Sequence, residues 1–337
     1  MNKISRRTVV AGAGALLGAS ILPYRARAAE FNIRVGNDVP ETHSVHKRLA
    51  EAAEQIGADT GGRVQIQVFP NSQLGSSVDM FSQVRSGALD MMTVGTPLGN
   101  TIPLASITGV AFAFPTLERA WEAADGELGD HVRKVVSEQA GIIMFDQVWD
   151  FGGYRHTTTS TKPIVAPEDF AGMKLRVPVT PLYNSTFRAL GASPVSINYA
   201  EVYSALQTGV ADGQENPLAL IETGRFYEVQ KYLSLTGHIW DAVTLVANPG
   251  TWSSLPADLQ EIVSNRMNEA ARNQRQDSLA LNAEIQQTLA NSGLTVNEVD
   301  KEPFRKALRD AGYYSEWKEK YGEEAWALLE KYAEGLT

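Results

Sequence analysis

The chain has 337 residues and no cysteine, and 39 aspartates and glutamates outnumber 30 lysines and arginines, which gives a net charge of −9. The lack of cysteine excludes disulfides, thiol catalysis, thiolate metal sites and a lipid-modified N-terminal cysteine. An acidic chain is also a poor candidate for binding nucleic acid or an anionic membrane surface, so an anionic ligand would need a local cationic site.

The first 28 residues have the pattern of an export signal. Arg6 and Arg7 follow a short polar start, Val9–Leu22 is apolar, and Ala26–Ala28 has the small residues of a cleavage site. The apolar stretch is shorter than the ~20 residues that cross a bilayer as a helix. The arginine pair predicts a twin-arginine signal, with an ordinary secretory signal as the alternative, and both predict that the mature protein leaves the cytoplasm.

Strand-like and helix-like segments then alternate. Apolar and polar residues alternate with period two in Phe31–Val35 and Val64–Val68, and Leu89–Val94 is mostly apolar. Helical spacing covers His43–Asp59 and Ser77–Ser86. This βαβαβ order predicts an α/β domain with a largely parallel sheet. Further strands are expected at Gly109–Phe114, Ile142–Val148, Lys174–Pro178, Pro194–Ile197 and Ala242–Ala247.

A long segment near the C-terminus lacks both proline and glycine. It runs from Ala257 to Ser292, about 36 residues, after Pro256 and before Gly293. One continuous helix of this length would reach ~54 Å, more than the width of one small domain. We therefore expect a single helix that runs along two domains, with two helices broken near Asn273–Asp277 as the alternative.

Motifs of catalysis are scarce. The mature chain has neither a G-x-S-x-G elbow nor a phosphate-binding G-x-x-x-x-G-K-[ST] loop. His43 and His46 lie three residues apart beside Glu41, but a zinc site needs three or four ligands in a recognisable spacing. We interpret the two histidines as a solvated pair at a helix start, and we predict no metal, no cofactor and no enzymatic activity.

Three stretches carry a family resemblance: Phe170–Pro178, Tyr199–Pro217 and Phe226–Tyr232. Together they resemble the substrate-binding subunit of tripartite ATP-independent periplasmic (TRAP) transporters, of the dicarboxylate-binding (DctP) type. The resemblance extends over essentially the whole mature chain. It implies a periplasmic protein that hands a small organic acid to a two-part membrane permease.

The resemblance also implies an architecture. Two α/β domains would be joined by a hinge, a long helix would cross both, and the ligand would bind in the cleft between them. On this basis we place the export signal at residues 1–28, the first domain at 29–153 with 242–280, and the second at 154–241 with 281–337.

The resemblance implies that Arg176 anchors the organic acid, that Asn216 supplies a second contact, that Arg155 is a further arginine of the site, and that Tyr199 lines the cleft. Arginine stays charged and presents a planar fork of donors that matches both carboxylate oxygens. Alternatives stay open for each residue. Arg176 would otherwise form a surface ion pair, Asn216 would cap a turn, Arg155 would hold the hinge, and Tyr199 would pack in the core.

Five further residues are candidates for the cleft wall, because clefts form at loops that follow strands in α/β sheets. These are Trp149, Tyr183, Trp240, Asp241 and Thr96. Members that bind sialic acid have polar residues where this chain has Val179 and Gly95–Thr96. We therefore expect a compact or aromatic monocarboxylate, or a hydroxy or keto acid, with a uronate or a small dicarboxylate as alternatives.

Two other functions share these features. A periplasmic sensory protein would present its acid to a receptor instead of a permease. A lyase or hydrolase would act on the acid in the same cleft, although the chain lacks an evident nucleophile, metal set or cofactor motif.

Overall fold

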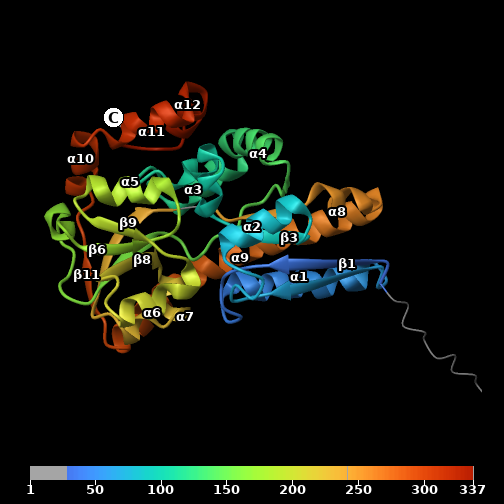
Figure 1. Cartoon of the computed structure of the whole chain (residues 1–337), viewed down its shortest axis with the longest axis horizontal. Helices are drawn as coiled ribbons and strands as arrows, with labels where there is room; N and C mark the ends of the chain where they lie inside the picture. Colours follow the sequence, from blue (N-terminus) through green and yellow to red (C-terminus); the bar gives the residue numbers. More distant parts are fainter. Residues whose placement is uncertain (1–28, 241, 337) are drawn as a thin grey trace, which may run out of the picture.

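The structure, a computed structural model, describes residues 29–240 and 242–336 (Figure 1). The predicted export signal and Asp241 therefore lie outside the described residues. The described chain forms two mixed β-sheets, each flanked by helices, and the long helix α9 runs beside both. In the described part of the chain, we find no helix both long and apolar enough to cross a membrane.

The first sheet has the strand order β2-β1-β3-β10-β4. Its strands are β1 (Phe31–Gly36), β2 (Val64–Phe69), β3 (Met91–Val94), β4 (Ile143–Met144) and β10 (Thr244–Ala247). β1 runs parallel to both β2 and β3, whereas β10 runs antiparallel to β3 and β4. Because β1 lies between β2 and β3, the connections that leave the carboxyl ends of these strands border a crevice at the edge of the sheet.

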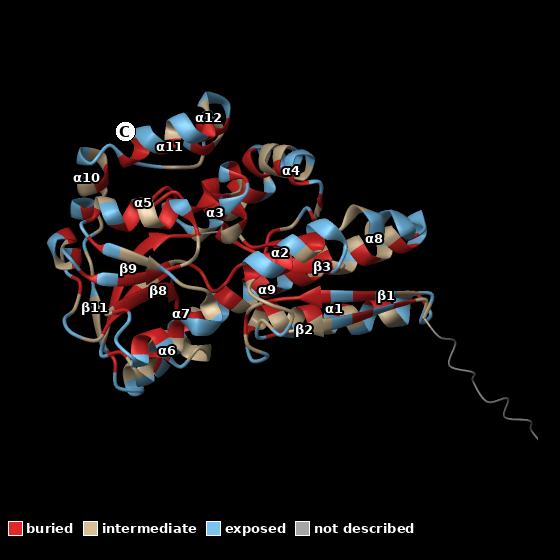
Figure 2. Cartoon of the chain, in the orientation of Figure 1, coloured by how far each residue is buried: buried red, intermediate tan, exposed pale blue. Residues whose placement is uncertain are grey.

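The second sheet has the order β11-β9-β5-β8-β6-β7. Its strands are β5 (Arg155–Thr159), β6 (Lys174–Val177), β7 (Ser193–Ser196), β8 (Gly213–Pro217), β9 (Tyr232–Ile239) and β11 (Thr295–Glu298). β8 runs antiparallel to β5 and parallel to β6. The central strands are buried, while the helices around them expose their outer faces (Figure 2).

The helices fill the spaces around the two sheets. They are α1 (Ser44–Asp59), α2 (Ser77–Ser86), α3 (Leu117–Asp125), α4 (Glu127–Ala140), α5 (Pro181–Ala189), α6 (Val202–Gln207), α7 (Leu218–Thr223), α8 (Pro249–Ser254), α9 (Ala257–Asn291), α10 (Glu302–Asp310), α11 (Tyr313–Tyr321) and α12 (Glu323–Glu330). Short 3₁₀ helices include η1 (Thr96–Asn100), η2 (Pro103–Gly109) and η4 (Tyr199–Glu201).

Side chains close in sequence to the first turns cap the N-termini of α1 and α2. Ser76 and Asp79 form a reciprocal capping box at the start of α2. His43 caps α1 by accepting a hydrogen bond from the backbone N–H of Val45, and its Nε2 lies 3.1 Å from the carbonyl oxygen of Phe151. The prediction of a solvated histidine pair is wrong for His43, which is 1% exposed. Burial lowers its pKa to about 4.

The expected long helix is confirmed as the single helix α9, and no break occurs near Asn273–Asp277. Its length is 35 residues, and it packs along α1 and α7. Buried polar side chains in its middle hold the segment that crosses from the first sheet to the second. Gln274 bonds both backbone groups of Asp150, and Arg275 donates to the carbonyl of Val148 while it pairs with Asp125.

Gly152 and Gly153 allow a tight turn in this crossing segment. Their φ angles are 119° and 82°, in the region that side chains rarely adopt. Both of their N–H groups donate to one carboxylate oxygen of Asp150, and the other oxygen accepts from the indoles of Trp121 and Trp240. The turn before β5 is therefore fixed by a buried carboxylate.

Several sequence expectations need correction. The largely parallel sheet is a mixed one, because β10 inserts antiparallel beside β3. The strand expected at Gly109–Phe114 is an irregular buried segment in which Phe112 has a φ of 56°. Its apolar residues are buried in a cluster with residues of the C-terminal helices, and this burial does not require the segment to pair as a strand. The strand expected at Ile142–Val148 is only the two-residue β4.

The C-terminal helices form an aromatic layer. Tyr313, Trp317 and Tyr321 of α11 and Trp326 of α12 are all buried. The two helices contact η2 and α4 as well as α5, so they touch elements assigned to both predicted domains. The domain boundaries proposed from the sequence stay a prediction.

Candidate functional site

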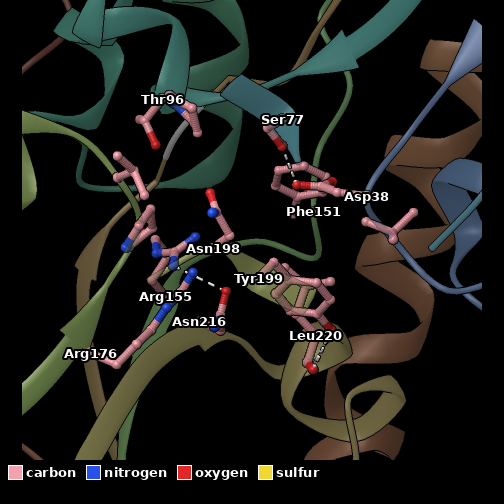
Figure 3. A pocket seen from close by; sticks show the side chains of 14 residues that line it. Asp38, Ser77, Thr96, Phe151, Arg155, Arg176, Asn198, Tyr199, Asn216 and Leu220 are labelled. Atoms are coloured by element: carbon pink, nitrogen blue, oxygen red, sulfur yellow. Dashed lines mark hydrogen bonds between the residues drawn. The ribbon is translucent and has the colours of Figure 1, made fainter. Parts of the chain in front are cut away.

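A cavity lies between the edges of the two sheets (Figure 3). Its walls combine charged, polar and apolar side chains: Asp38, Val39, Ser77, Thr96, Pro97, Phe151, Arg155, Arg176, Pro178, Val179, Asn198, Tyr199, Asn216 and Leu220. The first sheet supplies the segments after β1 and β3 and the start of α2, and the second supplies strand ends. This is where ligands bind in α/β proteins.

Strand register brings the cationic residues together. Arg155 starts β5 and pairs with Pro217, while Arg176 in β6 pairs with Gln214. Because β8 runs antiparallel to β5 and parallel to β6, the start of β5 and the ends of β8 and β6 meet at one edge of the sheet. Arg155, Asn216 and Arg176 therefore line one wall of the cavity.

Arg155 belongs to a buried ionic network. Its Nε donates to Oε2 of Glu215 at 2.5 Å, and its Nη2 donates to Oε1 at 2.8 Å and to Oδ1 of Asn216 at 3.0 Å. The ring of Tyr183 lies 5.2 Å from the guanidinium carbon. Arg155 is 2% exposed and Glu215 is fully buried. The fork-to-fork geometry fixes the orientation of the guanidinium.

The protonation of this network follows from its partners. Burial acts to raise the pKa of Glu215, but the charge of Arg155 and a hydrogen bond with His238 at 3.1 Å hold that pKa below its ordinary value. Burial lowers the pKa of His238 even though Glu215 favours its charged form. The network is therefore a charged Arg155–Glu215 pair with a neutral imidazole behind it.

Arg176 is also held, but incompletely. Its Nε and Nη2 donate to the carbonyl oxygen of Ile197 at 2.8 and 2.6 Å. The third nitrogen, Nη1, is buried and has no hydrogen-bond partner among the described residues. Burial lowers the pKa of Arg176 to about 10, so the group stays charged at neutral pH. A buried cationic donor without a partner needs an acceptor.

Asn216 and Tyr199 are fixed wall residues. The amide of Asn216 accepts from Arg155 and donates to Oε1 of Gln214 at 2.5 Å, so its orientation is set from both sides. The hydroxyl of Tyr199 donates to the carbonyl of Leu220 at 3.1 Å, and its ring packs against Phe226. Both side chains line the cavity. Their contact with a ligand stays a prediction.

The opposite wall carries an acid. Asp38 follows β1 by two residues, and the hydroxyl of Ser77, the first residue of α2, donates to its Oδ2 at 2.6 Å. Burial raises the pKa of Asp38. Thr96, which starts η1 after β3, lies in the same wall. One wall thus carries the two guanidinium groups, and the other carries a carboxyl group.

Three predicted wall residues lie elsewhere. Trp149, Tyr183 and Trp240 are at most 2% exposed and pack in the hydrophobic cores, and they are not among the described residues that line the cavity. The loop positions of Trp149 and Trp240 suggested a cleft, but their rings turn inward. Asp241 lies outside the described residues.

Sequence reasoning missed Asp38 and Ser77 and did not assign Asn198 to the site. The rule that placed Thr96 would have found the first two, because Asp38 follows β1 and Ser77 starts the helix after β2. No group of three or more histidine or acidic residues suited to a metal ion occurs within residues 29–240 and 242–336.

Comparison of the sequence with models of known families shows which family the chain belongs to. A model of the bacterial extracellular solute-binding proteins, family 7 (DctP), matches residues 35–319. The chain belongs to this family. The resemblance inferred from the three sequence stretches is therefore confirmed, and so is the predicted fold class of two α/β units with a long shared helix.

Relatives within the family cover nearly all of the chain. A solute-binding protein of Roseobacter denitrificans is 36% identical over 295 residues, which are 87% of this chain and 89% of the relative. The crystal structure of this relative, a TRAP periplasmic solute-binding protein, contains bound L-galactonate. The TM-score is 0.84 at 34% identity, over 90% of this chain and 100% of that one.

A second solved family member comes from a Sulfitobacter species and holds β-D-galacturonate. It is 30% identical to this chain with a TM-score of 0.83, over 88% of this chain and 98% of that one. The ligands of both solved relatives carry a carboxylate.

Proposed function

We propose that this protein captures a small organic acid by its carboxylate in the cavity between the two sheets and delivers it to a TRAP-type membrane permease. One observation carries the proposal. Nη1 of Arg176 is a buried, charged donor with no partner in the described chain, in a side chain that is 2% exposed. A carboxylate oxygen supplies the acceptor that this nitrogen lacks.

The charges of the wall support a single carboxylate. Among the described residues of that wall, Glu215 pairs with Arg155, whereas the charge of Arg176 has no ion-pair partner. The guanidinium of Arg176 is held by Ile197 and therefore does not need to reorganise when the anion arrives. Such preorganisation saves the entropy that a mobile side chain would lose on binding.

Binding favours closure of the cavity. Its walls come from both sheets, so a ligand contacts both walls at once only when they approach each other. A ligand that prefers this state shifts the population toward it. The closed form then presents the surface that docks on the permease, and the acid leaves chemically unchanged.

A thermal-shift screen over organic acids tests the carboxylate proposal. At least one carboxylate should raise the melting temperature of the wild type, because a ligand that binds only the folded state stabilises it. The same acid should have no effect on Arg176→Ala. The proposal fails if no carboxylate shifts the wild type, or if Arg176→Ala responds equally. Recovery of the unmodified acid after incubation separates binding from turnover.

Export and delivery need a cellular test. Fractionation should place the protein in the periplasm, and Arg6→Lys with Arg7→Lys should retain it in the cytoplasm if the signal is of the twin-arginine type. Uptake of the identified acid should require both this protein and the permease subunits. Uptake that is unaffected by deletion of the protein would favour a sensory role.

A further inference from the structure

A carboxyl group faces the cationic wall from the other side of the cavity. Asp38 and Ser77 both line the cavity, and Figure 3 shows them on the side opposite Arg155 and Arg176. The 2.6 Å hydrogen bond from the Ser77 hydroxyl fixes Oδ2 of Asp38. Ser77 is 9% exposed, whereas Asp38 is partly exposed. A ligand anchored on Arg176 would direct its far end toward this pair.

The pair leaves an acceptor open to the ligand. Ser77 provides the one side-chain hydrogen bond that Asp38 receives within the described residues, and it uses a single carboxylate oxygen. Burial raises the pKa of Asp38, while the hydrogen bond from Ser77 and the charge of Arg176 act against that rise and favour the ionised form. In that form a carboxylate can accept about four hydrogen bonds and donates none. A hydroxyl group on the ligand is the matching donor.

Two other kinds of ligand fit this wall poorly. A second carboxylate would meet the like charge of Asp38 in its ionised form, while Arg155 is engaged by Glu215 and Arg176 would face the first carboxylate. A purely apolar end would remove Asp38 from water without giving it a donor, which is unfavourable. An end that carries hydroxyl groups avoids both penalties.

We infer that Asp38, oriented by Ser77, accepts a hydrogen bond from a ligand hydroxyl distant from the carboxylate, and that the ligand is a hydroxylated monocarboxylate of the aldonate or uronate class. Asp38 is then a specificity-determining residue that selects hydroxyl groups and rejects a second acid. This inference rests on the proposed capture of a carboxylate by Arg176.

Calorimetric titration with four probes tests the inference. L-galactonate and D-galacturonate carry one carboxylate and several hydroxyls, galactarate adds a second carboxylate at the far end, and hexanoate lacks hydroxyls. The wild type should bind one of the two hydroxylated monoacids at least about ten-fold more tightly than galactarate and hexanoate, as expected for one hydrogen bond to a charged group.

Two variants assign the selectivity to Asp38. Asp38→Asn keeps the shape and the bond from Ser77, and it should weaken the hydroxylated monoacid about ten-fold, improve galactarate and leave hexanoate unchanged. Ser77→Ala should act in the same direction because it frees Asp38 to rotate. Glu41→Gln is the matched control, since it removes the same charge from an exposed position in the same segment and should change nothing.

Each outcome decides. Equal losses for all probes in Asp38→Asn, an unchanged profile, or a wild type that prefers galactarate or hexanoate or binds neither hydroxylated monoacid would overturn the inference. In any of these cases the inference falls. The proposed carboxylate capture still stands if the acid that the wild type binds most tightly does not bind Arg176→Ala. If the wild type binds no carboxylate at all, both fall. Equal melting temperatures of the variants exclude misfolding as the cause.

Discussion

The two walls of the cavity are built in different ways. The wall from the second sheet consists of strand residues whose side chains are locked by buried partners, with Arg155 held by Glu215 and Arg176 held by Ile197. The wall from the first sheet consists of segments that follow strands, and its Asp38 is partly exposed and receives a bond from one side chain. One wall holds guanidinium groups fixed by buried partners, and the other holds a partly exposed carboxyl group on a connecting segment.

This difference separates two tasks. A rigid guanidinium suits the group that every ligand of the site would share, its carboxylate, because little orientation entropy is lost on binding. The loop wall meets the rest of the ligand, and residues on loops change more freely than residues on paired strands. We therefore expect changes in the wall from the first sheet to alter selectivity and changes in the wall from the second sheet to abolish binding.

The largest effect should come from Arg176. Arg176→Ala removes a buried cation that would pair with the ligand, a loss of ~3–5 kcal/mol or more than about 100-fold in affinity. Arg176→Lys should also bind poorly because the planar fork is lost. Calorimetric titration with the acid found in the screen measures both. Lys174→Ala, at an exposed position of the same strand, is the control and should bind normally. Near-normal affinity of Arg176→Ala would show that the rigid wall is not the anchor.

Glu215→Gln should have the next largest effect, mainly on stability. It leaves the buried charge of Arg155 without its counter-ion, which costs ~3–5 kcal/mol of unfolding free energy for a buried pair. Urea unfolding measures the change. Glu122→Gln removes the exposed partner of Arg119 and should change little. Equal effects of the two variants would contradict the rigid-wall interpretation.

The third effect is acid destabilisation by buried histidines. Burial lowers the pKa of His43 to about 4 and that of His156 to about 3, whereas both titrate near 6.5 when unfolded. Below pH 6.5 the unfolded chain therefore binds more protons, and stability falls with pH until the folded values are reached. His43 alone should contribute about 1.4 kcal/mol per pH unit between 6 and 4.

A variant isolates the contribution of His43. His43→Asn keeps a helix-capping side chain at the start of α1 but does not titrate. Its unfolding free energy should depend less steeply on pH between 6.5 and 4 than that of the wild type. Parallel pH profiles would mean that His43 is not responsible for the slope.

The smallest effect should come from a hydrogen bond between η1 and the segment that follows β6. Nδ2 of Asn100, at the end of η1, donates to the carbonyl of Val179 just after β6. One exposed neutral hydrogen bond contributes about 1 kcal/mol or less, so Asn100→Ala should weaken ligand binding by about five-fold at most. Calorimetry would detect this, and a loss beyond ten-fold would mean that closure depends on this single bond.

The sequence by itself determined much of the local structure. Period-two and helical patterns located β1, β2, α1 and α2 nearly to the residue, and the absence of proline and glycine predicted α9 as one helix. These features depend on neighbours along the chain, so local patterns suffice. The family resemblance pointed to Arg176, Asn216 and Arg155, which lie together at one edge of the second sheet.

Only the tertiary structure decided which side chains meet. Trp149, Tyr183 and Trp240 turn into the cores, His43 is buried, and Asp38 with Ser77 lies in the wall from the first sheet. Strand register and packing between segments far apart in the chain set these orientations, and no local pattern encodes them. The unpartnered nitrogen of Arg176 is likewise visible only in three dimensions, because it depends on what every surrounding segment leaves unfilled.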